Sequence, residues 1–172
     1  MISIIMKKVV KFGGSSLANA EQFQKVGDII RGDESRRYVV PSAPGKRFSA
    51  DTKVTDLLYT CYGKAEAGED FTDVLTEIKG RFYEIIKGLN LDLSLEEEFR
   101  QIEADFKAHA GNEYAASRGE FLNGKVMAAY LGYEFIDSAT VIRFDKNGNF
   151  DADKTDKLLS KRLQKCERAV VP

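Results

Sequence analysis

A glycine pair constrains the fold of this chain more than any other feature of its sequence. Gly13 and Gly14 separate an apolar, β-branched segment at 4–12 from a segment at 20–30 whose apolar residues recur every three or four positions. The first pattern predicts a strand and the second an amphipathic helix, with a tight loop between them. A further short strand at 38–40 runs into a Pro-Ser-Ala-Pro-Gly turn. Strand, helix and strand in this order form a βαβ unit, which favours a parallel sheet covered by helices.

The middle of the chain, from about residue 51 to 132, has the spacing of a run of helices. Its apolar residues recur every three or four positions, and the pattern breaks near Gly68, Asn90 and Gly111. We therefore expect a largely helical insertion at 51–132, packed on one side of the sheet.

The remaining segment predicts two strands, a turn, a helix and a final strand. Alternating residues at 133–136 and 141–144 favour strands, and the Asn-Gly pair at 147–148 suits a type I′ hairpin turn with both central residues at positive φ. Leucines within 158–163 indicate a helix, and an apolar strand begins at 168–171. Together these elements predict an α/β fold with a mostly parallel sheet sandwiched by helices.

The composition argues against several classes of protein. With 172 residues and 43% hydrophobic side chains, the chain can bury one ordinary core. Its 26 basic and 27 acidic residues nearly cancel, so no overall field recruits a nucleic acid or an acidic membrane surface. Two cysteines are too few for a disulfide scaffold, and no apolar run reaches bilayer length. We expect a cytoplasmic protein that binds neither nucleic acid nor membrane.

The loop KFGGSS, at 11–16, joins the first strand to the first helix. Its two glycines let the backbone approach a ligand, so its amides are suited to phosphate oxygens. Lys11 lies near the carboxyl end of the strand, where open α/β sheets bind ligands, and its charge would offset charge on a transferring phosphoryl group. The loop matches neither the P-loop nor the dinucleotide pattern, so a plain turn, with Ser15 and Ser16 as helix caps, stays open.

Four motifs occur in order along the chain: KFGGSS, SAPGK after the second strand, VTDLL at the start of a helix, and SRGE further on. Together they resemble the aspartate kinases of the amino-acid kinase family, over residues 7–172. The resemblance implies a carbamate kinase-like fold, a homo-oligomeric complete enzyme, and a reaction in which ATP, with Mg²⁺, phosphorylates the side-chain carboxylate of L-aspartate. The product would be the acyl phosphate at the entry to lysine, threonine and methionine biosynthesis.

The resemblance also implies roles for individual residues. Lys11 would be the catalytic lysine that contacts the phosphates. The loop around the transferring group would consist of small residues: Gly13, Gly14, Ser15 and Ser16. The aspartate pocket would be lined by Ser42, Thr55 and Glu120. The chemistry fits these roles, because hydroxyl groups donate to carboxylate oxygens and a carboxylate pairs with the substrate's ammonium group.

Each pocket residue also has a purely structural interpretation. The SRGE segment at 117–120 is a capping box, in which Glu120 would reach back to a helix N-terminus. Thr55 would cap the helix that begins near it, and Ser42 would be a turn hydroxyl. Pro41, which has no amide donor, indicates that the second strand ends its hydrogen bonding there or lies on an edge.

Residues 1–172 are expected to form the N-terminal portion of a single amino-acid kinase domain. The final strand begins an apolar run with no partner loop after it, which indicates a chain cut inside a larger sheet. The resemblance places the ATP-binding half and the regulatory ACT domains outside this sequence, so we expect the isolated chain to be inactive. Two alternatives stay open. One is another family member, such as a glutamate, acetylglutamate or uridylate kinase, against which VTDLL and SRGE argue; the other is a non-catalytic assembly or regulatory module.

Overall fold

The computed structural model describes residues 6–172, which contain a parallel sheet of four strands in the order β1-β2-β4-β3. The strands are β1 (Lys8–Phe12), β2 (Arg36–Pro41), β3 (Glu134–Phe135) and β4 (Ala169–Val170). All three pairings are parallel, which confirms the predicted sheet type. The first two residues of the predicted strand at 4–12 lie outside the described residues.

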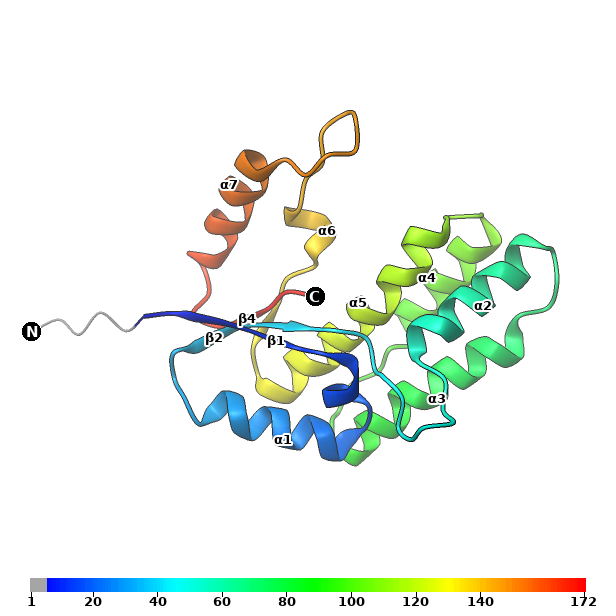
Figure 1. Cartoon of the computed structure of the whole chain (residues 1–172), viewed down its shortest axis with the longest axis horizontal. Coiled ribbons are helices and arrows are strands. Elements are labelled where there is room, and N and C mark those ends of the chain that lie inside the picture. Colours follow the sequence, from blue (N-terminus) through cyan, green and yellow to red (C-terminus); the bar gives the residue numbers. More distant parts are fainter. Residues whose placement is uncertain (1–5) are drawn as a thin grey trace, which may run out of the picture.

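Helices cover both faces of this sheet (Figure 1). On one face lie α1 (Ala20–Arg31) and α5 (Asn112–Leu131), and on the other lie α6 (Ser138–Val141) and α7 (Ala152–Leu163). The cap of α1 is Asn19, whose side chain accepts a hydrogen bond from the amide of Gln22 at 3.0 Å. The sandwiched α/β fold predicted from the sequence is confirmed.

The helical insertion consists of α2 (Val54–Glu66), α3 (Thr72–Gly88), α4 (Glu96–Lys107) and most of α5, gathered beside the sheet in Figure 1. Its predicted breaks are confirmed, because Gly68, Asn90 and Gly111 take φ values of 71°, 53° and 101°. A residue in this left-handed region cannot continue a right-handed helix, so the chain turns at each of these positions.

Two predictions for the chain after β3 are wrong: the strand at 141–144, and the type I′ turn at 147–148. The start of the 141–144 segment belongs to the short helix α6, which Asp137 caps by accepting from the amide of Ala139 at 3.0 Å. Beyond it, Phe144 and Phe150 form only an isolated antiparallel bridge.

At the turn itself, Gly148 takes a positive φ of 80°, but Asn147 does not. The side chain of Asp145 explains this difference, because it accepts from the amides of Asn147 at 2.8 Å and Asn149 at 2.9 Å. This local bonding favours a turn over residues 145–148, whose central residues Lys146 and Asn147 have negative φ, with Gly148 following them.

The carboxyl ends of β1 and β2 lie side by side, with Phe12 in register with Pro41. β2 ends at Pro41, but its hydrogen bonding to β1 continues one residue further, because the amide of Ser42 donates to the carbonyl of Phe12 at 3.0 Å. The alternative of an edge strand is wrong, because β2 lies between β1 and β4. No helix within residues 6–172 is both long and apolar enough to cross a membrane.

Candidate active site

A pocket of about 470 Å³ opens at the carboxyl ends of β1 and β2. Its walls come from the glycine loop, the segment after β2, the first turn of α2, and α5. The lining residues are Gly14, Ser15, Ser42, Ala43, Pro44, Gly45, Lys46, Lys53, Thr55 and Glu120. The structure thus brings together Gly14, Ser15, Ser42, Thr55 and Glu120 of the residues singled out in the sequence.

The other three predicted residues lie beside the pocket and do not line it. The Nζ atom of Lys11 is 3.5 Å from the Oγ atom of Ser42, so the lysine reaches the rim. Gly13 and Ser16 belong to the turn that forms a short 3-10 helix, η1 (Gly14–Leu17), in which the amide of Ser16 donates to the carbonyl of Gly13 at 3.1 Å. Since Asn19 caps α1, the alternative of Ser15 and Ser16 as caps of that helix is wrong.

Glu120 points from α5 towards the segment after β2, where its Oε1 atom accepts from the amide of Ala43 at 3.3 Å. The capping-box alternative is wrong, because α5 begins at Asn112 and Ser117 lies within it. The hydroxyl of Ser117 instead donates to the carbonyl of Tyr114, in the preceding turn, at 2.7 Å. The carboxylate of Glu120 is therefore available at the pocket wall.

The two predicted hydroxyls also face this pocket. Thr55 is the second residue of α2, whose N-cap position is Lys53 without a side-chain bond, so the alternative of Thr55 as a cap is wrong. Ser42 is held from both sides: its amide bonds to β1, and its carbonyl accepts from Nδ2 of Asn123 at 2.7 Å. Asn123 is fully buried in α5, three residues after Glu120.

Asn123 was not identified from the sequence. The signal available was a polar residue within the otherwise apolar, buried face formed by Gly119, Leu122, Val126 and Met127.

Positively charged side chains outnumber negatively charged ones around the pocket. Lys11, Lys46 and Lys53 stand at its rim or in its wall, and among residues 6–172 Glu120 is the only acidic residue that lines it. Within residues 6–172, no ion pair involves these three lysines or Glu120. Free lysines favour an anionic ligand, and a free carboxylate beside them favours a ligand that also carries an ammonium group. Lys53 was not predicted as part of the site.

A second pocket of about 490 Å³ adjoins the first and shares Thr55 and Glu120 with it. Its further walls include Arg118 of α5 and Ser138 of α6. The shared residues thus stand at the boundary of two cavities, which gives a ligand held by Glu120 room to extend in either direction.

The profile of the amino acid kinase family matches residues 6–171. The chain belongs to the amino acid kinase family. Among its curated relatives, Aspartokinase 3 of Bacillus subtilis (strain 168) is 38% identical in an alignment of 141 residues that covers 78% of this chain and 31% of that protein. The chain therefore spans about a third of the length of this relative.

Solved structures of two aspartate kinases share the fold. The crystal structure of Clostridium acetobutylicum aspartate kinase superposes with a TM-score of 0.93 at 46% identity, over 97% of this chain and 38% of that one. The structure of E. coli aspartokinase III in complex with aspartate and ADP gives a TM-score of 0.75 at 23% identity, over 95% of this chain and 40% of that one. The second likeness shows the fold alone.

Proposed function

We propose that this chain supplies the aspartate-binding wall and the phosphoryl-facing loop of an aspartate kinase, as part of a single amino-acid kinase domain. The reaction would transfer the γ-phosphoryl group of ATP to the side-chain carboxylate of L-aspartate and give 4-phospho-L-aspartate. One observation carries the proposal: the carboxylate of Glu120, which forms no ion pair within residues 6–172, lies in the same pocket as Gly14 and Ser15 of the glycine loop. The similarity to aspartate kinases of two bacteria supports the choice of substrate.

The polar groups of the pocket suit an amino acid. Glu120 would bind the ammonium group of L-aspartate through a charge-assisted hydrogen bond. Ser42 and Thr55 would donate their hydroxyls to carboxylate oxygens of the substrate. Bound in this way, the side-chain carboxylate would face the glycine loop across a pocket of about 470 Å³.

Phosphoryl transfer needs little beyond positioning and charge stabilisation. An oxygen of the aspartate side chain would attack the γ-phosphorus, the bond from this phosphorus to the bridging oxygen would break, and ADP would leave. Lys11 would stabilise the charge on the equatorial oxygens, and the backbone of Gly13, Gly14, Ser15 and Ser16 would surround the transferring group.

The pocket residues also indicate how Mg²⁺ would be held. Mg²⁺ bound with ATP would neutralise phosphate charge. Since Glu120 is the only acidic residue that lines this pocket among residues 6–172, and is assigned to the ammonium group, the nucleotide's phosphate oxygens would carry the ion on this side of the site.

Calorimetric titration with L-aspartate tests the substrate assignment. We expect the chain to bind L-aspartate more tightly than L-glutamate, and Glu120→Gln to weaken that binding by about tenfold or more, because a hydrogen bond between charged groups becomes one with a neutral partner. Glu66→Gln, at an exposed position of α2, is the matched control and should bind like the parent chain. Preference for glutamate would favour another kinase of the family, and equal binding by the Glu120 variant would refute the assignment.

Titration with ATP and Mg²⁺ tests the phosphate-facing loop separately. Lys11→Met should weaken the binding of ATP more than that of L-aspartate, whereas Lys64→Met, on α2 outside the pocket, should change neither. If the parent chain binds ATP, a Lys11 variant that binds it equally tightly would exclude the proposed phosphate contact.

A further inference from the structure

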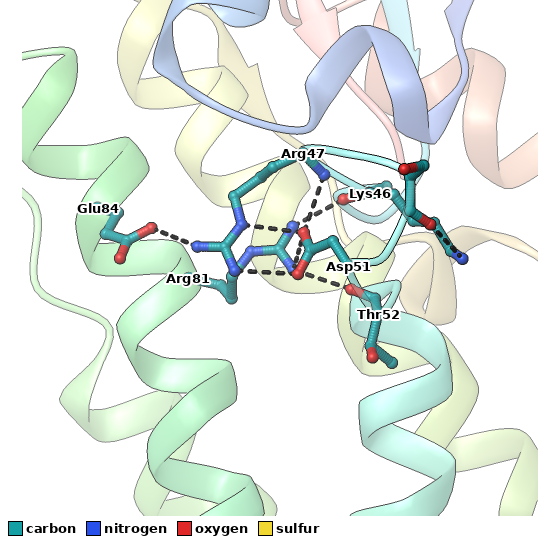
Figure 2. A network of polar contacts seen from close by, with 8 residues as sticks. Lys46, Arg47, Asp51, Thr52, Arg81 and Glu84 are labelled. Carbon is teal, nitrogen blue, oxygen red and sulfur yellow. Dashed lines mark hydrogen bonds and ion pairs between the residues drawn. The ribbon is translucent and has the colours of Figure 1, made fainter.

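An ion network with a buried centre joins the segment between β2 and α2 to helix α3 (Figure 2). At its centre Arg81 of α3 is only 2% exposed, and Asp51 is 8% exposed. The Nη1 atom of Arg81 lies 3.2 Å from Oδ2 of Asp51. Arg81 therefore carries its charge into the protein interior, where a cation is costly unless it is paired and hydrogen-bonded.

The same guanidinium group holds the backbone on both sides of Asp51. Its Nη2 atom donates to the carbonyl of Gly45 at 2.7 Å, and its Nη1 atom donates to the carbonyl of Thr52 at 2.9 Å. These two carbonyls mark the ends of the segment 45–52. One planar side chain from the helical insertion thus fixes the span of this segment.

Arg47 closes the network from within the segment. Its Nε and Nη2 atoms donate to the two carboxylate oxygens of Asp51 at 2.9 and 3.0 Å, and its backbone amide donates to Oδ2 at 2.9 Å. Its remaining arm contacts the exposed carboxylate of Glu84 at 2.9 Å (Figure 2). The carboxylate of Asp51 therefore lies between two arginines, and the segment is folded back on itself.

The fixed segment shapes the pocket, although Arg81 does not line it. Gly45 is a pocket residue, and its amide donates to the carbonyl of Gly14 at 2.8 Å. At the other end, the amide of Val54 donates to the carbonyl of Pro44 at 3.1 Å, immediately before Thr55. A shift of the segment would therefore move the glycine loop relative to the hydroxyl wall, the side of the pocket formed by Ser42 and Thr55.

Stability alone is a poor account of this arrangement. Buried ion pairs are often no more stabilising than apolar side chains of similar volume, and the Nε atom of Arg81 is buried without a hydrogen-bond partner among residues 6–172. Two bonds to specific carbonyls, in contrast, define a geometry that an apolar side chain cannot define.

We propose that Arg81 is a positioning residue of the aspartate site, which acts through the carbonyls of Gly45 and Thr52 to hold the glycine loop and the hydroxyl wall at the spacing that the substrate requires. The identity of the ligand rests on the proposed function, but the effect on the segment does not. The inference also gives α3, in the helical insertion, a direct part in the site.

Hydrogen exchange tests the effect on the segment without any ligand. Arg81→Met should speed the exchange of the amides of Gly45 and Val54 by about tenfold or more, because local opening becomes easier, while sheet amides such as that of Val39 change less. Arg81→Lys keeps the charge but loses the planar guanidinium group that donates to both carbonyls, so its exchange rates should be intermediate. Arg100→Met, an exposed position on α4, is the matched control and should leave all these amides unchanged.

Titration with L-aspartate then tests the consequence for the site. Affinity should fall in the order of the exchange effects, from Arg100→Met through Arg81→Lys to Arg81→Met, with a loss of about tenfold or more in the last. Should Arg81→Met fail to fold, Arg81→Lys decides the question with the same two measurements.

Two results would overturn the inference. One is unchanged exchange and unchanged affinity in the Arg81 variants. The other is faster exchange spread evenly over segment and sheet, which would make Arg81 a general stabiliser. If the parent chain itself binds no L-aspartate, the proposed function fails, and the exchange pattern still decides whether Arg81 positions the segment.

Discussion

Gly14 and Gly45 touch through their backbones: the amide of Gly45 donates to the carbonyl of Gly14 at 2.8 Å, and neither residue has room for a side chain. A Cβ atom on Gly45 would lie 2.6 Å from the carbonyl carbon of Gly14, and one on Gly14 would lie 2.8 Å from the carbonyl oxygen of Ala43. The neighbours are backbone atoms that cannot rotate away. This contact joins the glycine loop to the segment after β2.

Gly45→Ala should therefore push the two walls of the pocket apart. We expect a loss of about 1–3 kcal/mol in the free energy of unfolding, as for other insertions of a methyl group into a close contact. Affinity for L-aspartate should fall as well, because Ser42 and Gly14 would no longer keep their spacing. Urea unfolding and calorimetric titration measure the two effects, and a variant with unchanged stability would show that the backbone relaxes without cost.

Two helical glycines provide the opposite case. Gly63 of α2 and Gly80 of α3 are exposed, and within residues 6–172 a Cβ atom at either position would meet no atom within 4 Å apart from the adjoining backbone of its own helix. Gly63→Ala and Gly80→Ala should each raise the free energy of unfolding by about 0.5–1 kcal/mol, because alanine loses less backbone freedom in a helix. Both variants should bind L-aspartate like the parent chain. Destabilisation in either would mean that the helix needs the glycine for close packing.

Much of the fold could be predicted from the sequence because its patterns are local. The glycine pair after an apolar run marks the end of β1, and apolar spacing together with Gly68, Asn90 and Gly111 marks the helices. The failure at 141–144 has a local cause as well, because the capping side chain of Asp137 favours a helical turn over a strand.

The site could be predicted only in part. A hydroxyl in a pocket and a hydroxyl in a cap look alike in sequence, so Ser42, Thr55 and Glu120 came from the family resemblance, and their binding roles stay predictions. Arg81 was not identified from the sequence, because its partners Gly45 and Thr52 are distant in the chain, 36 and 29 residues away. Its only local signal is an arginine on the buried face of α3, next to Phe82.

The helical insertion should depend strongly on Phe106 of α4. Its ring is fully buried and meets the rings of Tyr62 at 5.5 Å and of Phe71 and Tyr114 at 6.4 Å between centroids. Phe106→Ala should lower the free energy of unfolding by about 3–5 kcal/mol, because it leaves a cavity that the surrounding helices cannot fill. Phe106→Leu, which keeps most of the apolar volume, should cost less than half as much. Equal losses in the two variants would contradict a packing role.

The acid stability of the chain should depend on Asp51. The hydrogen bond from the Arg47 side chain holds the pKa of this carboxyl well below its usual range, and the charge of Arg81 acts in the same direction, against the effect of burial. A carboxyl with a depressed pKa in the folded state contributes stability that is fully present above its unfolded pKa, about 3.9, and is lost as the pH falls towards the folded value. The window for this loss therefore begins near pH 4 and extends downwards.

Asp51→Asn should be less stable than the parent chain by about 3 kcal/mol at pH 7, because it leaves buried Arg81 without its carboxylate partner. The difference should stay constant down to about pH 5 and shrink between about pH 4 and pH 2.5, as the parent chain loses the contribution of the ionised carboxyl. Urea unfolding at a series of pH values measures it. Asp92→Asn, at an exposed position between α3 and α4, should differ little from the parent chain throughout. A gap for Asp51→Asn that widens as the pH falls would show that the carboxyl is stabilised in its protonated form and would contradict its place between the two arginines.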